Sequence, residues 1–216
     1  MRAVLIAAKQ LALAKTRLIP ALPAVSERSS LAAAMFRDVL SAALSAQTPE
    51  RVIVVTCDPV LMMVARNTKA AVINEEYPRG LNVAVRLATT KLIAAGTTCI
   101  CTLLSDIPLV TGDDIDAAFA AMPFEQRAVT LVPSRDFSGT NIIVRKPPDV
   151  IATQFGRFSL LRHLDDCRQQ GIACQIVRLE RPALDLDVPA DLQEFERRHS
   201  PTHTQAHLAR LSLAQS

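Results

Sequence analysis

Glycine is scarce in this chain of 216 residues, and the first of its six glycines is Gly80. The segment before Gly80 therefore contains none of the glycine-rich loops that let a backbone approach phosphate groups in many nucleotide-binding proteins. No apolar run approaches the roughly 18 residues that a membrane-spanning helix needs. The five cysteines include no CxxC pair, which excludes a zinc-finger arrangement. We expect them to be reduced thiols in a protein core.

An excess of one sign of charge is also missing. The formal net charge is +3, too small to indicate a general nucleic-acid-binding surface. Half of the residues are apolar and 21% are charged, which excludes the disordered and fibrous classes. The apolar start, Met1–Ala7, is too short for a signal peptide and predicts a strand. We therefore expect a cytoplasmic monomer or homodimer that binds neither a membrane nor a nucleic acid.

Strand-like and helix-like segments alternate along the chain, as in a mostly parallel sheet covered by helices. Apolar runs predict strands at 3–7, 51–56, 71–74, 99–104, 128–133, 141–145 and 174–179. Helical spacing and capping residues predict helices at about 31–44, from 59, at 81–95, from 112 to near 123, at 159–170 and at 189–198. The connection from 133 to 141 is too short for a crossover helix, which predicts a small antiparallel excursion. We expect one α/β domain at 1–199 and a polar, loosely held tail at 200–216.

A carboxylate, Asp106, follows the predicted buried strand 99–104. Ligands of open α/β sheets bind just beyond the carboxyl ends of the strands, so Asp106 is predicted at a functional edge. We expect two further acids, Asp185 and Asp187, at the end of a second strand. Magnesium prefers one or two carboxylates together with water and phosphate oxygens, so these acids predict a magnesium site. The alternative is that each acid only caps the following helix.

The loop after the first predicted strand is basic and contains Lys9, Lys15 and Arg17. We expect it at the same edge of the sheet as Asp106. Cations there would neutralise a triphosphate and stabilise the charge that develops on a leaving pyrophosphate. The alternative is a solvated basic loop, since lysine and arginine are ordinary surface residues.

Two further segments at this edge predict a clamp for a small phosphorylated acid. Around Gly139 the backbone permits close approach, and Thr140 and Asn141 supply hydrogen-bond donors. Gly156 and Ser159 precede or begin a helix, where backbone N–H groups gather into an anion site. An ordinary hairpin turn and an ordinary helix cap are the alternatives.

The polar loop 74–82 is a candidate for contact with a nucleotide base, although the sequence does not identify the base. A plain turn followed by a helix cap is the alternative for this loop. We expect no catalytic role for the four histidines, which lie in or near the C-terminal helices and tail: His163, His199, His203 and His207.

An ordered set of motifs between residue 3 and about residue 195 resembles one known family. The motifs are Lys9 with Ala14–Leu18, Val54–Pro59, Gly80–Asn82, Ser105–Leu109, Arg135–Asn141, Phe155–Gly156 with Ser159, and Asp185–Pro189. In order and spacing they resemble the guanylyltransferases that act on 2-phospho-L-lactate, phosphoenolpyruvate or 3-phospho-D-glycerate in deazaflavin coenzyme biosynthesis. Ser105, where an alanine is more familiar, and Phe137-Ser138, in place of a smaller glycine-containing pair, depart from the pattern. The second departure leaves the acceptor open.

The resemblance implies a nucleotidyltransferase with a doubly wound α/β fold that uses GTP, magnesium and a small phosphorylated acid. It implies Lys15, Arg17 and Asp106 as catalytic residues, and Asp106 and Asp187 as metal ligands with Asp185 as an alternative. The implied nucleotide-binding residues are Lys9, Asp58, Gly80 and Asn82. The implied acceptor-binding residues are Thr140, Asn141, Gly156 and Ser159. A molybdopterin or sugar-phosphate nucleotidyltransferase, and a non-catalytic nucleotide-binding module, remain as alternatives; the missing glycine-rich first loop argues against the first two.

Overall fold

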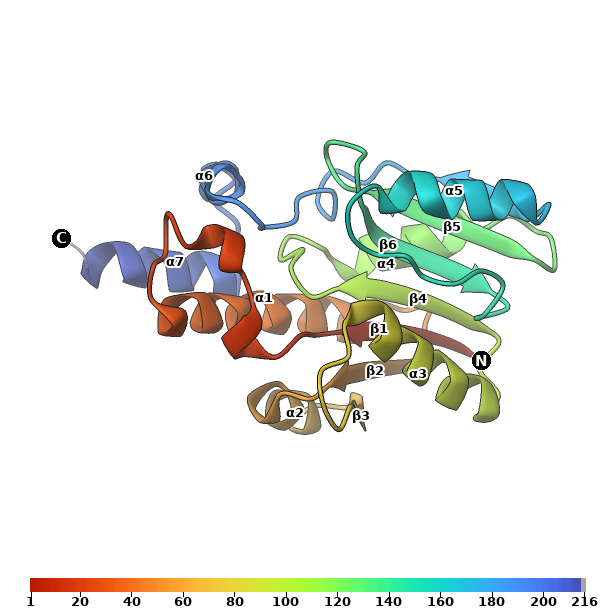
Figure 1. The fold of residues 1–216 in the computed structure, drawn as a ribbon, viewed down its shortest axis with the longest axis horizontal. Helices are drawn as coiled ribbons and strands as arrows, with labels where there is room; N and C mark the ends of the chain where they lie inside the picture. The colour runs from red at the N-terminus through yellow and green to blue at the C-terminus, as the bar shows by residue number, and fades with distance from the viewer. Residues whose placement is uncertain (215–216) are drawn as a thin grey trace.

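The structure, a computed structural model, describes residues 1–214, with side chains described up to Leu211. Within that range a seven-stranded sheet has the order β3-β2-β1-β4-β6-β5-β7 (Figure 1). Strand β6 runs antiparallel to both of its neighbours, and the other adjacent strands pair in parallel. The strands are β1 (Arg2–Ala7), β2 (Arg51–Thr56), β3 (Ala71–Asn74), β4 (Cys99–Leu104), β5 (Ala128–Pro133), β6 (Thr140–Lys146) and β7 (Ala173–Ile176).

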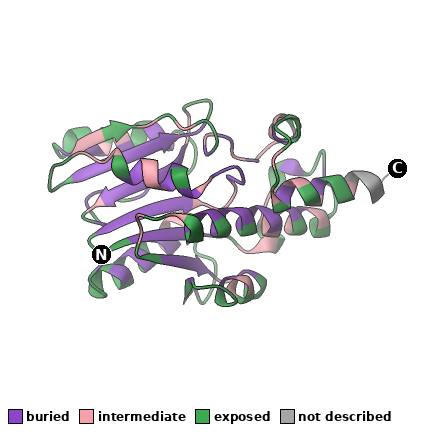
Figure 2. Ribbon diagram, turned by 180° about the vertical axis from the view of Figure 1, so that it is seen from behind, coloured by how far each residue is buried: buried purple, intermediate pink, exposed green. Residues whose placement is uncertain are grey.

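Helices cover both faces of this sheet. On β1, Val4 and Ile6 pack into a core cluster with α1, α2 and α4, whereas Leu5 and Ala7 pack into a second cluster with α3 and α5. Successive side chains of a strand point to opposite faces, so one strand supplies both clusters. Figure 2 shows the central strands as the buried centre of the molecule. The helices are η1 (Leu11–Leu13), η2 (Thr16–Leu18), α1 (Val25–Ser45), α2 (Pro59–Arg66), α3 (Leu81–Ala94), α4 (Gly112–Ala120), α5 (Ser159–Gln169), α6 (Pro189–Arg197) and α7 (His203–Ala214).

The predicted α/β class and the antiparallel excursion are confirmed. The strands at 51–56, 71–74, 99–104 and 128–133 have the predicted bounds. The excursion lies inside the sheet, because β6 is inserted between β4 and β5. Strand β7 ends at Ile176 rather than at residue 179; the N–H of Val177 still bonds to the carbonyl of Leu131, and the chain then leaves the sheet.

The expectation of a loosely held tail is wrong for residues 203–214, which form α7 beside α1 (Figure 1). The carboxylate of Asp38, on α1, accepts the N–H groups of His203 (2.7 Å) and Thr204 (2.9 Å) and the hydroxyl of Thr204 (2.6 Å). This cap comes from a distant part of the chain, so no local sequence pattern predicts it. Residues 215–216 of the predicted tail lie outside the described residues, and the domain boundary at 199 stays a prediction.

A third core cluster lies beside the sheet and joins the first loop and α1 to residues 184–208. Its buried members are Leu18, Leu22, Leu31, Met35, Leu109, Leu184, Leu186, Leu192, Phe195 and Leu208. The cluster fixes the segment after Lys15 against the segment that contains Asp185 and Asp187. Across the part of the chain that the structure describes, no helix combines the length and apolar character needed to cross a membrane.

Candidate active site

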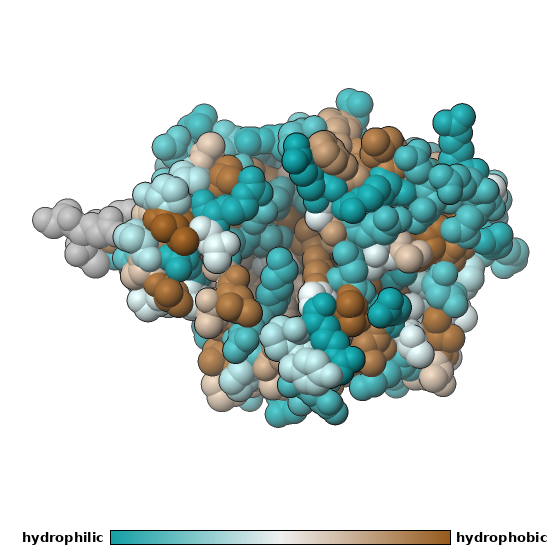
Figure 3. All heavy atoms as spheres, in the orientation of Figure 1, coloured by the Kyte–Doolittle hydropathy of each residue, from teal (hydrophilic) through white to brown (hydrophobic). Residues whose placement is uncertain are grey.

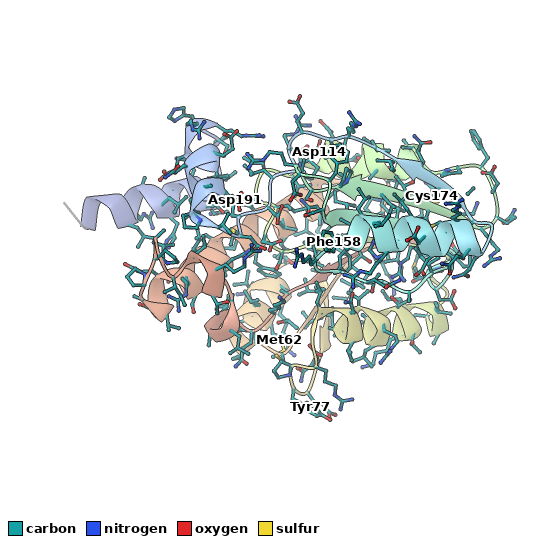
Figure 4. The ribbon with its side chains drawn as sticks, turned by 45° about the horizontal axis from the view of Figure 1, so that its top comes forward. Met62, Tyr77, Asp114, Phe158, Cys174 and Asp191 are labelled. Carbon is teal, nitrogen blue, oxygen red and sulfur yellow. The ribbon has the colours of Figure 1, made fainter. Side chains whose placement is uncertain are left out.

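A cavity of about 970 Å³ lies at the edge of the sheet where β1 and β4 end and β6 begins. The first loop, the segment after β4, the β5–β6 loop, the start of α5 and residues 183–191 line it. The space-filling view shows this face hollowed near its middle, with polar and apolar side chains around the hollow (Figure 3). Two of the lining residues, Phe158 and Asp191, mark the α5 and α6 sides of the cavity (Figure 4). The segments expected at one edge of the sheet therefore meet around one space.

Lys15 lies between two of the predicted carboxylates. Its Nζ is 2.6 Å from Oδ2 of Asp106 and 2.7 Å from Oδ1 of Asp187, and its side chain is only 7% exposed. Burial lowers the pKa of Lys15, but the two carboxylates outweigh burial and leave the pKa above its ordinary value. Burial raises the pKa of Asp187, and the cations, Lys15 foremost, lower it below its ordinary value. An ammonium group therefore occupies the space between the acids where a bound cation is predicted.

The other two basic residues of the first loop are more exposed. The side chain of Arg17 is 70% exposed, and its Nη1 is 3.6 Å from Oδ2 of Asp187. Lys9 is exposed and lines the cavity. Both side chains are free to reach toward a large anion in the cavity.

The position of Lys15 depends on how the first loop is anchored. Lys15 has φ +56°, in the left-handed region that residues other than glycine seldom adopt. Earlier in the loop, the N–H of Leu11 donates to Oδ2 of Asp58 (2.9 Å), and its carbonyl accepts the hydroxyl of Ser29 (3.1 Å). Asp58 also caps α2 and lines no part of the cavity. The structure thus gives Asp58, which we predicted as nucleotide-binding, the task of anchoring this loop.

Asp185 and Asp187 lie in the loop after β7 and not at a strand end, which corrects the prediction from the sequence. The N–H of Leu186, between them, donates to the backbone carbonyl of Asp106 (3.0 Å). This single bond joins the end of the loop to the segment after β4. It brings Asp187 to Asp106 without a strand.

Asn141 positions the acidic segment. Its Nδ2 donates to the carbonyls of residues 182 (2.9 Å) and 183 (3.2 Å) and lies 3.3 Å from Oδ1 of Asp185. Burial raises the pKa of Asp185 to about 6, with repulsion from Asp106 and Asp187 adding to the shift and the Asn141 hydrogen bond opposing it. The side-chain NH₂ of Asn141, which we predicted as a donor to the acceptor, is therefore already engaged by the protein.

Two buried hydroxyls line the cavity at the start of α5. The hydroxyl oxygen of Ser159 accepts the N–H of Thr140 (2.8 Å), and Oγ1 of Thr140 lies 3.0 Å from Nδ1 of His163. Nε2 of His163 accepts the N–H of Gln154 (2.8 Å), so the neutral ring carries its proton on Nδ1 and donates to Thr140. Among the described residues neither hydroxyl donates to a protein acceptor. Both hydroxyls therefore still have a hydrogen that a ligand in the cavity could accept.

The imidazole of His163 is fully buried, and burial lowers its pKa to about 4, helped by the charges of Arg145 and Arg162. Gly156, three residues before Ser159, has φ +119°, which favours glycine and turns the backbone into α5. The predicted acceptor residues Thr140, Gly156 and Ser159 thus surround one corner of the cavity. Hydroxyl and backbone donors at a helix start suit an anion.

The predicted nucleotide-binding residues of the β3–α3 loop divide into two groups. Gly80 lines a second recess of about 90 Å³, and Lys9 lines both this recess and the main cavity. Asn82 lines neither; its Nδ2 donates to the carbonyl of Phe155 (3.1 Å), and its Oδ1 accepts the N–H of Phe155 (2.8 Å). Asn82 therefore holds the start of α3 to the segment before α5.

Two site residues were missed from the sequence. His163 lies one helical turn after Ser159, a spacing that places both on one helix face and was available as a signal. Glu75, buried at the wall of the second recess, belongs to the polar loop 74–82 but was not singled out. Its burial depends on how the loop folds, which the sequence pattern does not reveal.

Comparison with known proteins identifies close similarity over nearly the whole chain. The family model described as "Guanylyl transferase CofC like" matches residues 1–216. A phosphoenolpyruvate guanylyltransferase of Sphaerobacter thermophilus is 36% identical over 188 residues, which cover 87% of this chain and 88% of that protein. A 3-phospho-D-glycerate guanylyltransferase of Phenylobacterium zucineum is 34% identical, covering 80% and 79%. A 2-phospho-L-lactate guanylyltransferase of Methanothermobacter thermautotrophicus is 30% identical, covering 92% and 85%.

Solved structures share the fold at much lower sequence identity. A nucleotidyl transferase from Methanothermobacter superposes with a TM-score of 0.64 at 14% identity, covering 92% of this chain and 97% of that one. A cytidylyltransferase from Leptospira borgpetersenii gives 0.63 at 12% identity, covering 99% and 93%. These likenesses establish the nucleotidyltransferase fold alone.

Proposed function

The chain belongs to the CofC-like guanylyl transferase family and is a guanylyltransferase, and we propose that it transfers GMP from GTP to a small phosphorylated carboxylic acid. The candidate acceptors are 2-phospho-L-lactate, phosphoenolpyruvate and 3-phospho-D-glycerate, and the product would enter deazaflavin coenzyme biosynthesis in the cytoplasm. One observation carries the proposal: one cavity is lined by a basic loop, a cluster of carboxylates and two hydroxyls, those of Thr140 and Ser159, that donate to no described protein acceptor. The names of three relatives support the acceptor class.

In the proposed reaction an oxygen of the acceptor phosphate attacks the α-phosphorus of GTP in line. The bond from the α-phosphorus to the bridging oxygen of the β-phosphate breaks, and pyrophosphate leaves with that electron pair. The acceptor phosphate is already ionised, so the attack needs no general base. Thr140 and Ser159 donate to the acceptor phosphate, and Lys15 and Arg17 stabilise the charge on the leaving pyrophosphate.

The carboxylates fit a magnesium ion that is shared with substrate. Oδ1 of Asp106 is buried without a hydrogen-bond partner, as suits an oxygen reserved for a cation. Among residues 1–214 no group of three or more acidic, histidine or cysteine side chains is arranged to hold a metal alone. Asp106 and Asp187, with Asp185 as alternative, would hold magnesium together with phosphate oxygens and water. The ion would neutralise charge on the nucleotide phosphates.

The proposal is tested by mixing the protein with GTP, magnesium and each of the three acids and measuring pyrophosphate release. We expect release with at least one acid, together with a product in which GMP is joined to that acid. Asp106→Asn should reduce the rate by about a hundredfold or more. Asp113→Asn is the matched control, since Asp113 is exposed and lies outside the cavity. Absence of release with all three acids would overturn the proposal.

A further inference from the structure

We propose that Glu75 selects guanine by accepting hydrogen bonds from the two adjacent donors of the base, its ring N1–H and its 2-amino group. This inference rests on the proposed function, in which GTP is the donor. It assigns a specificity-determining role to a residue that takes no part in the phosphate chemistry described above.

Glu75 lies where a base attached to phosphates in the main cavity would reach. The small recess that it lines adjoins the main cavity, since Ala7, Lys9, Leu13 and Leu81 line both. Lys9, the first cation of the basic loop, lines both spaces and so stands at this junction. A nucleotide can therefore place its phosphates beside Lys15 and its base in the recess.

The recess is shaped by short and apolar side chains. Leu13 of the first loop, and Pro78, Leu81 and Ala84 around the start of α3, line it. Leu13 is 60% exposed although it is a large apolar residue, so a flat ring packed against it would remove apolar surface from water. Apolar walls with one or two polar groups are typical of sites for planar ligands.

The carboxylate of Glu75 is held in place by a hydrogen bond but has no salt-bridge partner among the described residues. Glu75 is 7% exposed, and its N–H donates to the carbonyl of Thr56 at the end of β2 (3.0 Å). Its Oε1 accepts the N–H of Arg79 (3.2 Å), which fixes the side chain. No lysine, arginine or histidine of the described residues forms an ion pair with it. A carboxylate offers about four acceptor positions, so most of its capacity remains free.

Glu75 is buried, whereas its neighbours in the same loop are exposed. Tyr77 lies at the tip of the loop, away from the body of the molecule (Figure 4). Glu76 is exposed and lines neither the recess nor the main cavity. The buried position of Glu75 is therefore not a general property of this acidic loop.

Guanine is the base that a buried carboxylate matches. Its N1–H and 2-amino group are adjacent donors, which the two oxygens of a carboxylate accept side by side. Adenine and cytosine place a ring-nitrogen lone pair beside their amino group, so one carboxylate oxygen would face an acceptor. In uracil the single ring N–H lies between two carbonyl acceptors. Leaving a buried charge unpaired is costly, so the recess discriminates against these bases.

Hypoxanthine gives the sharpest test, because inosine triphosphate differs from GTP only by lacking the 2-amino group. One hydrogen bond to a charged acceptor corresponds to about ten- to a hundredfold in affinity. We expect wild-type protein to bind GTP tighter than inosine triphosphate by that factor, and ATP more weakly still. Calorimetric titration of the three nucleotides measures this directly and needs no variant.

Glu75→Gln keeps one acceptor but points an amide NH₂ at the 2-amino group of guanine. We expect it to narrow the GTP preference over inosine triphosphate to within about threefold. Glu76→Gln is the matched control and should retain the wild-type ratio. Thermal unfolding of each variant establishes that it is folded before the ratio is compared.

Equal affinity of wild-type protein for GTP and inosine triphosphate would overturn the inference, as would an unchanged ratio in folded Glu75→Gln. The proposed function and guanine selection by Glu75 can be refuted independently of each other. If GTP supports pyrophosphate release with one of the acids but the ratio does not depend on Glu75, the proposed function stands and guanine selection by Glu75 is refuted. If no acid gives release but the ratio depends on Glu75, base recognition stands and the proposed reaction is refuted.

Discussion

Acid is expected to destabilise this protein through His163. The folded protein holds the imidazole neutral and buried, with a pKa of about 4. In the unfolded chain a histidine has a pKa of about 6.5. Between these values the unfolded state binds a proton that the folded state does not, so stability is full above pH 6.5 and is lost as the pH falls. The linkage relation gives a loss of about 2 kcal/mol between pH 7 and pH 5.

The assay is urea unfolding of wild-type protein and of His163→Gln at pH 7, 6 and 5, followed by circular dichroism. The difference between the two pH dependences isolates His163. This subtraction matters because Asp185, with its pKa raised to about 6, acts in the opposite direction in the same window. Protonating Asp185 removes an unfavourable buried charge, so it stabilises the folded state as the pH falls.

His163→Gln should be less stable than wild type at pH 7, because it loses packing and the bond to Thr140. The difference in free energy of unfolding between wild type and His163→Gln should shrink by about 2 kcal/mol at pH 5, since glutamine does not titrate. His203→Gln is the control, because His203 is exposed, and it should follow the wild-type pH dependence. If His163→Gln loses stability with acid as steeply as wild type, His163 is not the buried neutral group and the assigned tautomer loses its support.

Three further results are expected. In steady-state kinetics, Thr140→Val should raise the KM for the phosphorylated acid about tenfold and leave the KM for GTP unchanged. Thr140→Ser retains the hydroxyl, so its KM values should stay near those of wild type. Equal KM values for the two variants would contradict a hydroxyl contact. Lys15→Met should lower kcat by about a hundredfold. In calorimetry without nucleotide it should bind magnesium tighter than wild type, because the ammonium group no longer competes for Asp106 and Asp187. Weaker magnesium binding would refute that competition. Asp38→Asn should cost about 2 kcal/mol in urea unfolding by weakening the cap of α7, and an unchanged midpoint would show that the cap contributes nothing.

The central strands were predictable because they are buried on both faces, whereas the edge strands β3 and β7 are only partly buried. The run Cys99–Leu104 reads as a continuous apolar segment, and its bounds match β4. The meeting of Lys15 with Asp106 followed from the same logic, since parallel strands deliver their following loops to one edge. Local chemistry and sheet topology were therefore sufficient to predict that Lys15 and Asp106 meet.

Other features of the structure depend on contacts between residues far apart in the sequence, which no periodic pattern encodes. Asp187 reaches Asp106 through a loop held by the backbone bond of Leu186, although the sequence predicted a strand end. The cap of α7 by Asp38 is equally non-local. Asp58 carried a familiar motif but anchors the first loop instead of facing the cavity. Sequence motifs thus located the site more reliably than they assigned each contact within it.

The third core cluster has a consequence for the order in which activity can arise during synthesis. Leu18 and Leu22 leave the ribosome early, but they pack against Leu184, Leu186 and Phe195, which are made much later. Until those partners emerge, the nascent chain has Lys15 without Asp187 and a basic loop with an incomplete apolar support. With the proposed roles of Lys15 and Asp187, we expect a partly synthesised chain to be inactive even after the central strands have paired, and activity to begin only when the late segment packs against the early one.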